Sequence, residues 1–154
     1  MTSIWLKPVE RDDVVPLIKL EVGADQDGFV APNVYSLAQL HYETGAYGFG
    51  IMNGEARIGY AQIIDMREHK YREIYDEENS AFLWRFMIAH PEQGKGYGKA
   101  AMGHLFDWAR ARGLPRFFTS VVETNPQARA FYAGLGLTPT GEKDGDELIL
   151  VRDL

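Results

Sequence analysis

The sequence contains no cysteine, and this absence excludes several kinds of chemistry. Without thiols there is no disulfide framework, no thiolate nucleophile and no cysteine-ligated metal. The four histidines are scattered without the spacing of a metal site; they are His41, His69, His90 and His104. We therefore predict chemistry that uses neither a metal nor a thiolate.

Long apolar runs are also missing. No stretch approaches the roughly 18 apolar residues of a membrane-spanning helix, and residues 1–5 show no signal-peptide pattern. A chain of 154 residues is about the size of one domain, so we expect a single domain over residues 1–154. The net charge of −6 argues against nucleic acid and towards cationic partners. Together these features favour a cytoplasmic protein.

Glycine is concentrated at one place in the chain. Gly94, Gly96 and Gly98 alternate in the stretch Gln93 to Gly98, between an apolar strand-like run and a long amphipathic helix pattern. Glycines just before a helix leave backbone N–H groups bare, and a helix N-terminus adds unpaired donors and the positive end of a dipole. This stretch therefore predicts an anion-binding turn.

Spacing excludes a P-loop as the origin of this turn. A P-loop has the pattern Gly-x-x-x-x-Gly-Lys-Ser/Thr, with the hydroxyl on magnesium. Here Gly94 and Gly98 enclose three residues rather than four, and Ala100 stands where the hydroxyl is required.

A dinucleotide-binding fingerprint fits better but not fully. Gly96-x-Gly98-x-x-Ala101 matches its glycine pattern, and Glu123 lies near the end of the next expected strand. That motif turns directly out of its strand, however, whereas residues 89–93 intervene here. Too little chain follows for a doubly wound domain, so a dinucleotide oxidoreductase is the outlying alternative.

Hydrophobic periodicity predicts a mixed α/β fold with the order β-α-α-β-β-β-α-β-α-β. We expect strands at 4–6, 49–52, 58–64, 81–88, 117–122 and 148–151, the 81–88 strand being central because only Arg85 is charged. We expect Asp12 to cap a helix that runs to about Leu20, with Pro16 in its first turn. Ser36 is expected to cap a second helix that runs to about Tyr42. Residues 21–35 and 67–80 read as loops, and Asn53-Gly54 as a hairpin turn.

Two further helices are expected in the second half of the chain. One follows Gly96 and ends near Gly113, with Met102, Leu105, Phe106 and Ala109 on its apolar face. The other is capped by Asn125, begins at Pro126 and stops at Gly136.

Two motifs in order resemble the GNAT superfamily of acyl-CoA-dependent N-acyltransferases. The first is Gln93-x-x-Gly96-x-Gly98, a short loop after the strand Phe82–Ile88. The second is Asn125-Pro126-x-Ala128-x-x-Phe131-Tyr132-x-x-x-Gly136-Leu137, after the next strand. The resemblance covers roughly residues 81–140. It implies the GNAT fold, a mixed, mostly antiparallel sheet of about six to seven strands flanked by about four helices.

The resemblance also implies acetyl-CoA as co-substrate, without a metal. The backbone N–H groups of Gly94 to Gly98 would bind the CoA pyrophosphate, with Lys95 and Lys99 adding charge. The backbone of residues 86–88 would hydrogen-bond the pantetheine arm as a missing strand would. The cofactor residues expected on this basis are Phe86, Met87, Ile88, Gln93, Gly94, Lys95, Gly96, Tyr97, Gly98, Lys99, Asn125 and Tyr132.

Tyr132 is the candidate catalytic residue, since the family places a tyrosine here as the general acid for the departing CoA thiolate. A phenol with a pKa near ~10 is protonated at neutral pH and can donate this proton. Its position on the apolar face of a helix, taken alone, favours a core tyrosine; the two motifs together favour the catalytic role.

A general base is not visible in the sequence. Some members of the family carry a glutamate on the central strand, but the position that aligns with it is Phe82, and the charged residue of this strand is Arg85. A water relayed to an acid of the 67–80 segment is possible, although a solvated loop is the plainer interpretation of those acids, Glu73, Asp76, Glu77 and Glu78.

The segment Asp27–Gln39 resembles that of bacterial spermine/spermidine acetyltransferases in the same superfamily, where it joins two helices flanking the acceptor cleft. Acidic and aromatic side chains suit a polyamine, and the expected substrate residues are Glu21, Asp25, Asp27, Phe29 and Tyr35. We therefore predict N-acetylation of a small polyamine such as spermidine or spermine, by a homodimer as in relatives. Other amines (an aminoglycoside, an amino acid or a protein N-terminus) and a non-catalytic CoA-binding module remain alternatives.

Overall fold

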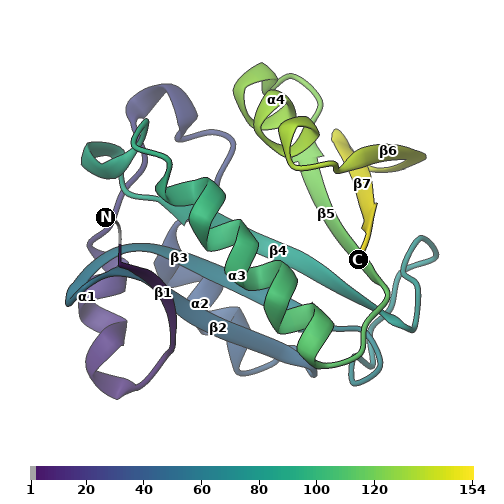
Figure 1. The fold of residues 1–154 in the computed structure, drawn as a ribbon, viewed down its shortest axis with the longest axis horizontal. Coiled ribbons are helices and arrows are strands. Elements are labelled where there is room, and N and C mark those ends of the chain that lie inside the picture. Colours follow the sequence, from purple (N-terminus) through teal and green to yellow (C-terminus); the bar gives the residue numbers. More distant parts are fainter. Residues whose placement is uncertain (1–2) are drawn as a thin grey trace.

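The computed structural model describes residues 3–154 as a seven-stranded sheet with helices on both faces (Figure 1). The strands stand in the order β1-β2-β3-β4-β5-β7-β6, and within the described range only β4 and β5 pair in parallel. Their bounds are β1 Ile4–Pro8, β2 Ala46–Asn53, β3 Ala56–Asp65, β4 Ser80–Ile88, β5 Arg116–Val122, β6 Thr138–Asp144 and β7 Glu147–Asp153. The predicted mixed α/β class and mostly antiparallel sheet are confirmed, with β4 at its centre.

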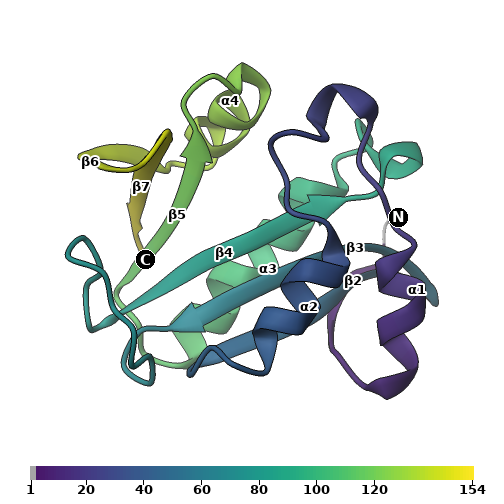
Figure 2. The same ribbon diagram turned by 180° about the vertical axis from the view of Figure 1, so that it is seen from behind.

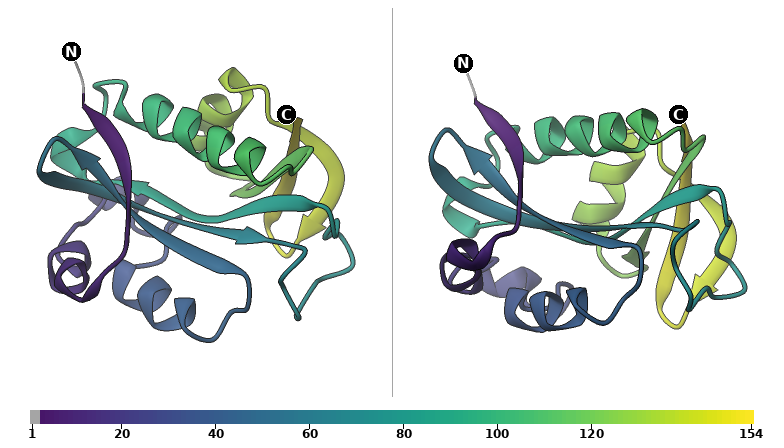
Figure 3. Two further views of the ribbon diagram at one scale, coloured as in Figure 1. Left: turned by 60° about the horizontal axis from the view of Figure 1, so that its bottom comes forward. Right: turned by 90° about the horizontal axis from the view of Figure 1, so that it is seen from below.

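Helices cover the two faces of the sheet unequally. The long helix α3 lies along one face, and the short helices α1 and α2 lie on the other (Figures 2 and 3). The helix bounds are α1 Val14–Ile18, α2 Asn33–Leu40, α3 Tyr97–Ala111 and α4 Pro126–Gly134. In the part of the chain that the structure describes, none of the helices is long and apolar enough to cross a membrane.

The main core lies between α3 and the sheet. The predicted apolar face of α3 is fully buried there, and its residues are Met102, Leu105, Phe106 and Ala109. A smaller cluster fills the other face under α1 and α2, where Leu17 and Leu37 pack on Tyr60 and Met87. Burial of these side chains is the main force that holds the layers together.

The strands β4 and β5 pair over only part of their length. Their register runs from Ser80↔Arg116 to Leu83↔Thr119 and stops there. On its other side β4 pairs with β3 through a bulge, because the register passes from Leu83 to Arg85 and skips Trp84. Beyond Leu83 the edge of β4 therefore does not pair with β5, and the two strands diverge towards α4 (Figure 1).

The start of the first helix differs from the prediction. The expected cap Asp12 is exposed, whereas the buried Asp13 makes a capping box with Glu10 at the short 3₁₀ helix Arg11–Asp13. The amide of Glu10 donates to Asp13 Oδ2 at 2.8 Å. The extra 3₁₀ turn moves the α-helix to Val14–Ile18, with Pro16 in its first turn as expected.

The second helix also begins earlier than predicted. It starts at Asn33 directly after Pro32, so Ser36 lies inside the helix, buried, and does not cap it. Asn33 ties the start of α2 to α1, since its Nδ2 donates to the Leu17 carbonyl at 2.8 Å. The segment 21–35, predicted as a loop, contains the 3₁₀ helix Ala24–Gln26 as well as this first turn of α2.

The strand β6 has no counterpart among the predicted elements. All its residues are exposed, so it has no apolar alternation from which periodicity could detect it. Its pairing with β7 is irregular between Pro139 and Lys143.

We predict that Asp13 contributes acid-sensitive stability. Burial alone would raise the pKa of Asp13, but hydrogen bonds from Lys7, the Glu10 amide and Arg57 outweigh it and hold the pKa at about 2, below the ordinary 3.8. This stability is present above pH ~4 and is lost as the pH falls towards ~2. Because the two cations are partly exposed and screened, we expect about 1–2 kcal/mol.

Urea unfolding of the Asp13→Asn variant between pH 6 and 2 would check this. The variant should be less stable near neutral pH and should lack this part of the acid dependence. Asp12→Asn removes the same charge from an exposed neighbour and should leave the pH profile unchanged. An unaltered profile in Asp13→Asn would contradict the prediction.

Candidate active site

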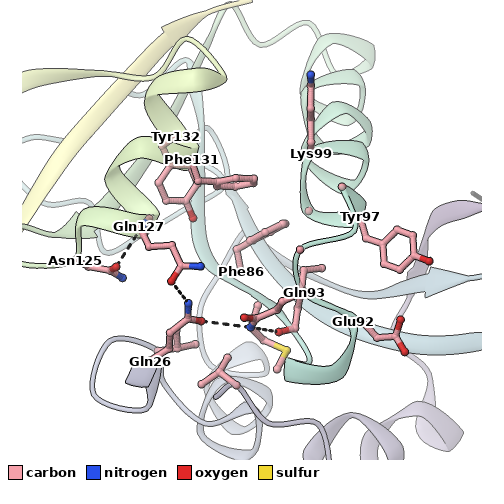
Figure 4. Close-up of a pocket in the computed structure, with 18 residues that line it drawn as sticks. Gln26, Phe86, Glu92, Gln93, Tyr97, Lys99, Asn125, Gln127, Phe131 and Tyr132 are labelled. Atoms are coloured by element: carbon pink, nitrogen blue, oxygen red, sulfur yellow. Dashed lines mark hydrogen bonds between the residues drawn. The ribbon is translucent and has the colours of Figure 1, made fainter. Parts of the chain in front are cut away.

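A cavity of about 420 Å³ opens beside the free edge of β4 (Figure 4). Its walls come from β4, the glycine turn with the start of α3, helix α4, and the connection between α1 and α2. Every predicted cofactor residue except Lys95 lines this cavity. Lys95 instead places its ammonium 3.3 Å from a carboxylate oxygen of Glu92. The sequence motifs thus identify one physical site, although they lie far apart in the chain.

The glycine turn has the backbone geometry that its sequence predicts. Gly94 and Gly96 have φ values of 76° and 82°, a conformation that favours glycine, and Gly96 is the N-cap of α3. The first amide of this segment to find an acceptor is that of Ala100, which donates to Gly96 at 3.3 Å. Within the described chain, the N–H groups from Gly94 to Lys99 have no such partner. Unpaired donors at a helix N-terminus suit a phosphate group.

The free edge of β4 presents alternate backbone groups to the cavity. The Ala89 amide donates to the Ile58 carbonyl of β3 at 2.8 Å, so residues 87 and 89 face β3. In an antiparallel ladder the backbone groups of alternate residues point in opposite directions. The backbone groups of Phe86 and Ile88 therefore point away from β3, towards the cavity. An extended ligand can pair with this edge as a strand would.

Three glutamine side chains connect the walls of the cavity by hydrogen bonds (Figure 4). Gln93 Nε2 donates to the Ile88 carbonyl at 2.8 Å and to Gln26 Oε1 at 3.3 Å. Gln26 Nε2 donates in turn to Gln127 Oε1 at 2.6 Å. Gln26 and Gln127 were not predicted, because a neutral amide between Asp25 and Asp27, or at a variable motif position, carries no recognisable pattern.

Tyr132 is buried in α4 and still lines the cavity. It projects with Phe131 from α4 towards Phe86 (Figure 4), and the Phe131 and Phe86 rings stack at 6.1 Å. Burial raises the pKa of Tyr132 to about 12, and the Thr119 hydroxyl acts in the opposite direction. The phenol is therefore protonated at every physiological pH and can donate a proton into the cavity.

Asn125 caps α4 as predicted, since its Oδ1 accepts from the Ala128 amide at 3.2 Å. The helix ends as predicted as well, because Gly136 has a φ of 79° and the Leu137 amide returns to the Tyr132 carbonyl at 3.1 Å. Asn125 lines the cavity at the same time, so its side chain can both cap the helix and face a ligand.

A second cavity, of about 240 Å³, lies on the opposite side of β4 and β5. Aromatic side chains of β4, Phe82 and Trp84, form part of its floor. Its acidic residues make no ion pair within the described chain, and they are Glu43, Glu73, Asp76, Asp144 and Glu147. Of the acids considered in the 67–80 segment, the other two contact arginines, Glu77 with Arg116 and Glu78 with Arg72.

The structure does not bring the predicted acceptor residues into either cavity. Glu21, Asp25 and Asp27 are exposed, Phe29 is half-buried, and Tyr35 is exposed on α2. Residues of the same segment that do line the first cavity are apolar or neutral, namely Val22, Gln26 and Val30. The loop reaches the site, but its charges do not.

The fold and the site share one set of features: a mostly antiparallel sheet with one diverging parallel pair, an open strand edge, a glycine turn and a buried tyrosine. Residues 17–137 match the family described as acetyltransferase (GNAT) family. The chain belongs to this family.

Individual relatives agree with this assignment. The uncharacterized N-acetyltransferase YycN of Bacillus subtilis (strain 168) is 30% identical over 89 residues, 58% of this chain. The match covers 53% of that relative, so the chain spans about half its length.

Solved structures show the same fold. An acetyltransferase from Thermus thermophilus superposes with a TM-score of 0.67 at 24% identity, covering 98% of this chain and 97% of its own. Spermidine N-acetyltransferase from Vibrio cholerae, in complex with CoA and spermine, superposes with a TM-score of 0.72 at 19% identity, covering 97% and 95%.

We predict that Gly96 is required for its conformation rather than for space. Among the described residues, apart from its two chain neighbours, nothing lies within 4 Å of a Cβ placed on Gly96, but its φ of 82° is strained for other residues. Gly96→Ala should therefore lower the free energy of unfolding by about 1–2 kcal/mol. Chemical denaturation would measure this.

Gly103 provides the matched control, because it lies inside α3, its φ is not positive, and a Cβ placed on it would meet no described residue outside its own stretch of helix within 4 Å. Gly103→Ala should raise stability by about 0.5–1 kcal/mol. Equal effects of the two substitutions would contradict the conformational explanation.

Proposed function

We propose that the protein transfers the acetyl group of acetyl-CoA to a primary amine of a small polycationic molecule such as spermidine or spermine. The observation that carries the proposal is the first cavity, in which unpaired amides, an open strand edge and a protonated tyrosine face one space. An acyl-CoA has three parts that match these features. Its pyrophosphate is an anion, its pantetheine arm is extended and contains amides, and its thiolate leaving group needs a proton.

Within this proposal the residues act on successive parts of the donor. The N–H groups of the glycine turn would hold the pyrophosphate, with the Lys99 ammonium nearby. The edge groups of Phe86 and the amide of Ile88 would pair with the pantetheine amides, since Gln93 already occupies the Ile88 carbonyl. The Asn125 side chain would meet the same arm. The thioester would then lie beside Tyr132, at the end of the paired part of β4 and β5.

The chemistry requires the amine nitrogen to attack the thioester carbon and the sulfur to leave. The C–N bond forms, the C–S bond breaks, and Tyr132 would give its hydroxyl proton to the departing thiolate. The high pKa of Tyr132 suits this role, because the proton stays on the phenol until a basic thiolate is generated next to it.

The second cavity supports a cationic acceptor. It lies on the other side of the diverging strands, and its unpaired carboxylates and aromatic walls attract an alkylammonium chain. The exposed acids of the 21–27 segment would add long-range attraction, in keeping with the net charge of −6. A protein with this fold has been crystallised with CoA and spermine.

Direct assays test the donor and the acceptor separately. Acetyl-CoA should raise the melting temperature and NADH should not, since a ligand stabilises the fold that binds it. Release of free CoA thiol should be fastest with spermidine or spermine in a panel that includes an aminoglycoside, amino acids and a peptide N-terminus. Turnover of another amine but not of polyamines would redirect the acceptor proposal, and CoA binding without any transfer would favour a binding module.

Tyr132→Phe should reduce kcat by about 10²–10⁴-fold at neutral pH while the KM for acetyl-CoA changes little, because only the proton donor is removed. Steady-state kinetics would measure both values. Tyr42→Phe removes a hydroxyl from an exposed tyrosine that lines neither cavity and is the control, with kcat expected close to that of the wild type. An unchanged kcat in Tyr132→Phe would exclude its role as the general acid.

A further inference from the structure

Glu147 combines features that no other acid of the second cavity shares. It is the first residue of β7, it is half-buried, and it pairs with Val122 of β5. Ser120 Oγ donates to Glu147 Oε1 at 3.2 Å. Its carboxylate lines the cavity without an ion pair within the described chain. By contrast, Asp76 belongs to the connection before β4, and its Oδ2 accepts the Glu73 amide at 2.7 Å.

The position of Glu147 relative to Tyr132 follows from two consecutive residues of β5. Thr119 and Ser120 point to opposite faces of the sheet, as neighbours in a strand do. The Thr119 hydroxyl lies beside Tyr132 and donates to the Leu83 carbonyl at 2.9 Å. Ser120 holds Glu147 on the other face. Tyr132 and Glu147 therefore flank the two sides of β5 at the level where its pairing with β4 ends.

The surroundings of Glu147 raise its pKa, and no group there forms an ion pair with it in the described chain. Burial raises the pKa of Glu147 above the ordinary 4.5; the Ser120 hydrogen bond and Arg85 lower it, while Asp144 and Asp146 raise it. Arg85 faces it from β4, where the guanidinium stacks on Trp84 at 4.4 Å. Across the cavity lie further titratable groups, which are Glu43, His69, Tyr71, Glu73, Tyr75 and Asp76.

We propose that Glu147 is the general base that takes a proton from the acceptor ammonium, an assignment that rests on the proposed function. An alkylammonium with a pKa near ~10.4 is neutral in only about one molecule in a thousand at pH 7, so the reaction needs a proton acceptor on the amine side. The neutral nitrogen then attacks the thioester and the sulfur leaves with the proton of Tyr132. The second nitrogen proton returns to the tyrosine oxygen, and Glu147 releases its proton to solvent.

The pH dependence of kcat/KM for spermidine tests the assignment with Glu147→Gln, which keeps an acceptor for the Ser120 hydroxyl. We expect kcat/KM to fall about 100-fold at pH 7. The deficit should shrink as the pH rises towards 10, because solvent then deprotonates the amine. A purely structural role would lower the rate equally at every pH. Glu142→Gln removes an exposed acid of β6 and should match the wild type.

Ser120→Ala gives a second readout with a defined sign. Removing the hydrogen bond raises the pKa of Glu147, so the acidic limb of the wild-type profile should move to higher pH.

An active wild type whose Glu147→Gln variant keeps the full rate, or loses it uniformly with pH, would overturn the assignment alone. A wild type that transfers acetyl to no amine would overturn the proposed function and the assignment with it. Thermal melts separate the two sites. If acetyl-CoA stabilises Glu147→Gln as much as the wild type, the donor site is intact, and a loss of rate in the variant then arises from deprotonation or binding of the amine.

Discussion

The partial pairing of β4 with β5 is the constraint on which the rest of the site depends. Hydrogen bonds join the strands only as far as Leu83 and Thr119. A fully paired sheet would satisfy every edge group of β4 internally and would leave no backbone for a ligand. Because the strands diverge, the Phe86 and Ile88 groups are not used in strand pairing with β5, and within the described chain a cavity lies on each side of the two strands. Gln93 occupies the Ile88 carbonyl. Consecutive residues of β5, Thr119 and Ser120, support the proposed chemistry on the two sides.

Parts of the site that depend on local geometry could be predicted from sequence. Positive φ at Gly94 and Gly96, the Asn125 cap and the Gly136 stop follow from rules that involve only neighbouring residues, and the structure has all of them. The sheet was largely predictable for a similar reason, since its buried strands alternate or run apolar. The exposed strand β6 and the early start of α2 left no such pattern.

The proposed acceptor side could not be predicted, because its residues meet only in the folded chain. Glu43, Asp76 and Glu147 come from three separate parts of the chain, and no spacing links them. Charge in the sequence pointed instead to Glu21, Asp25 and Asp27, which are close together in the chain but stay outside both cavities. Density of charge along a sequence is thus a weaker guide than convergence of charge in space.

The chain of neutral amides from Gln93 through Gln26 to Gln127 has a consequence for how the site responds to its medium. These side-chain amides carry no net charge and do not titrate in the physiological pH range. Changes of ionic strength or pH should therefore not alter the distance between the cavity walls that they join. The proposed capture of a phosphate by the glycine turn would, in contrast, be screened by salt. The shape of the first cavity and its electrostatic attraction for a ligand would therefore be independent properties, and mutation could change one without the other.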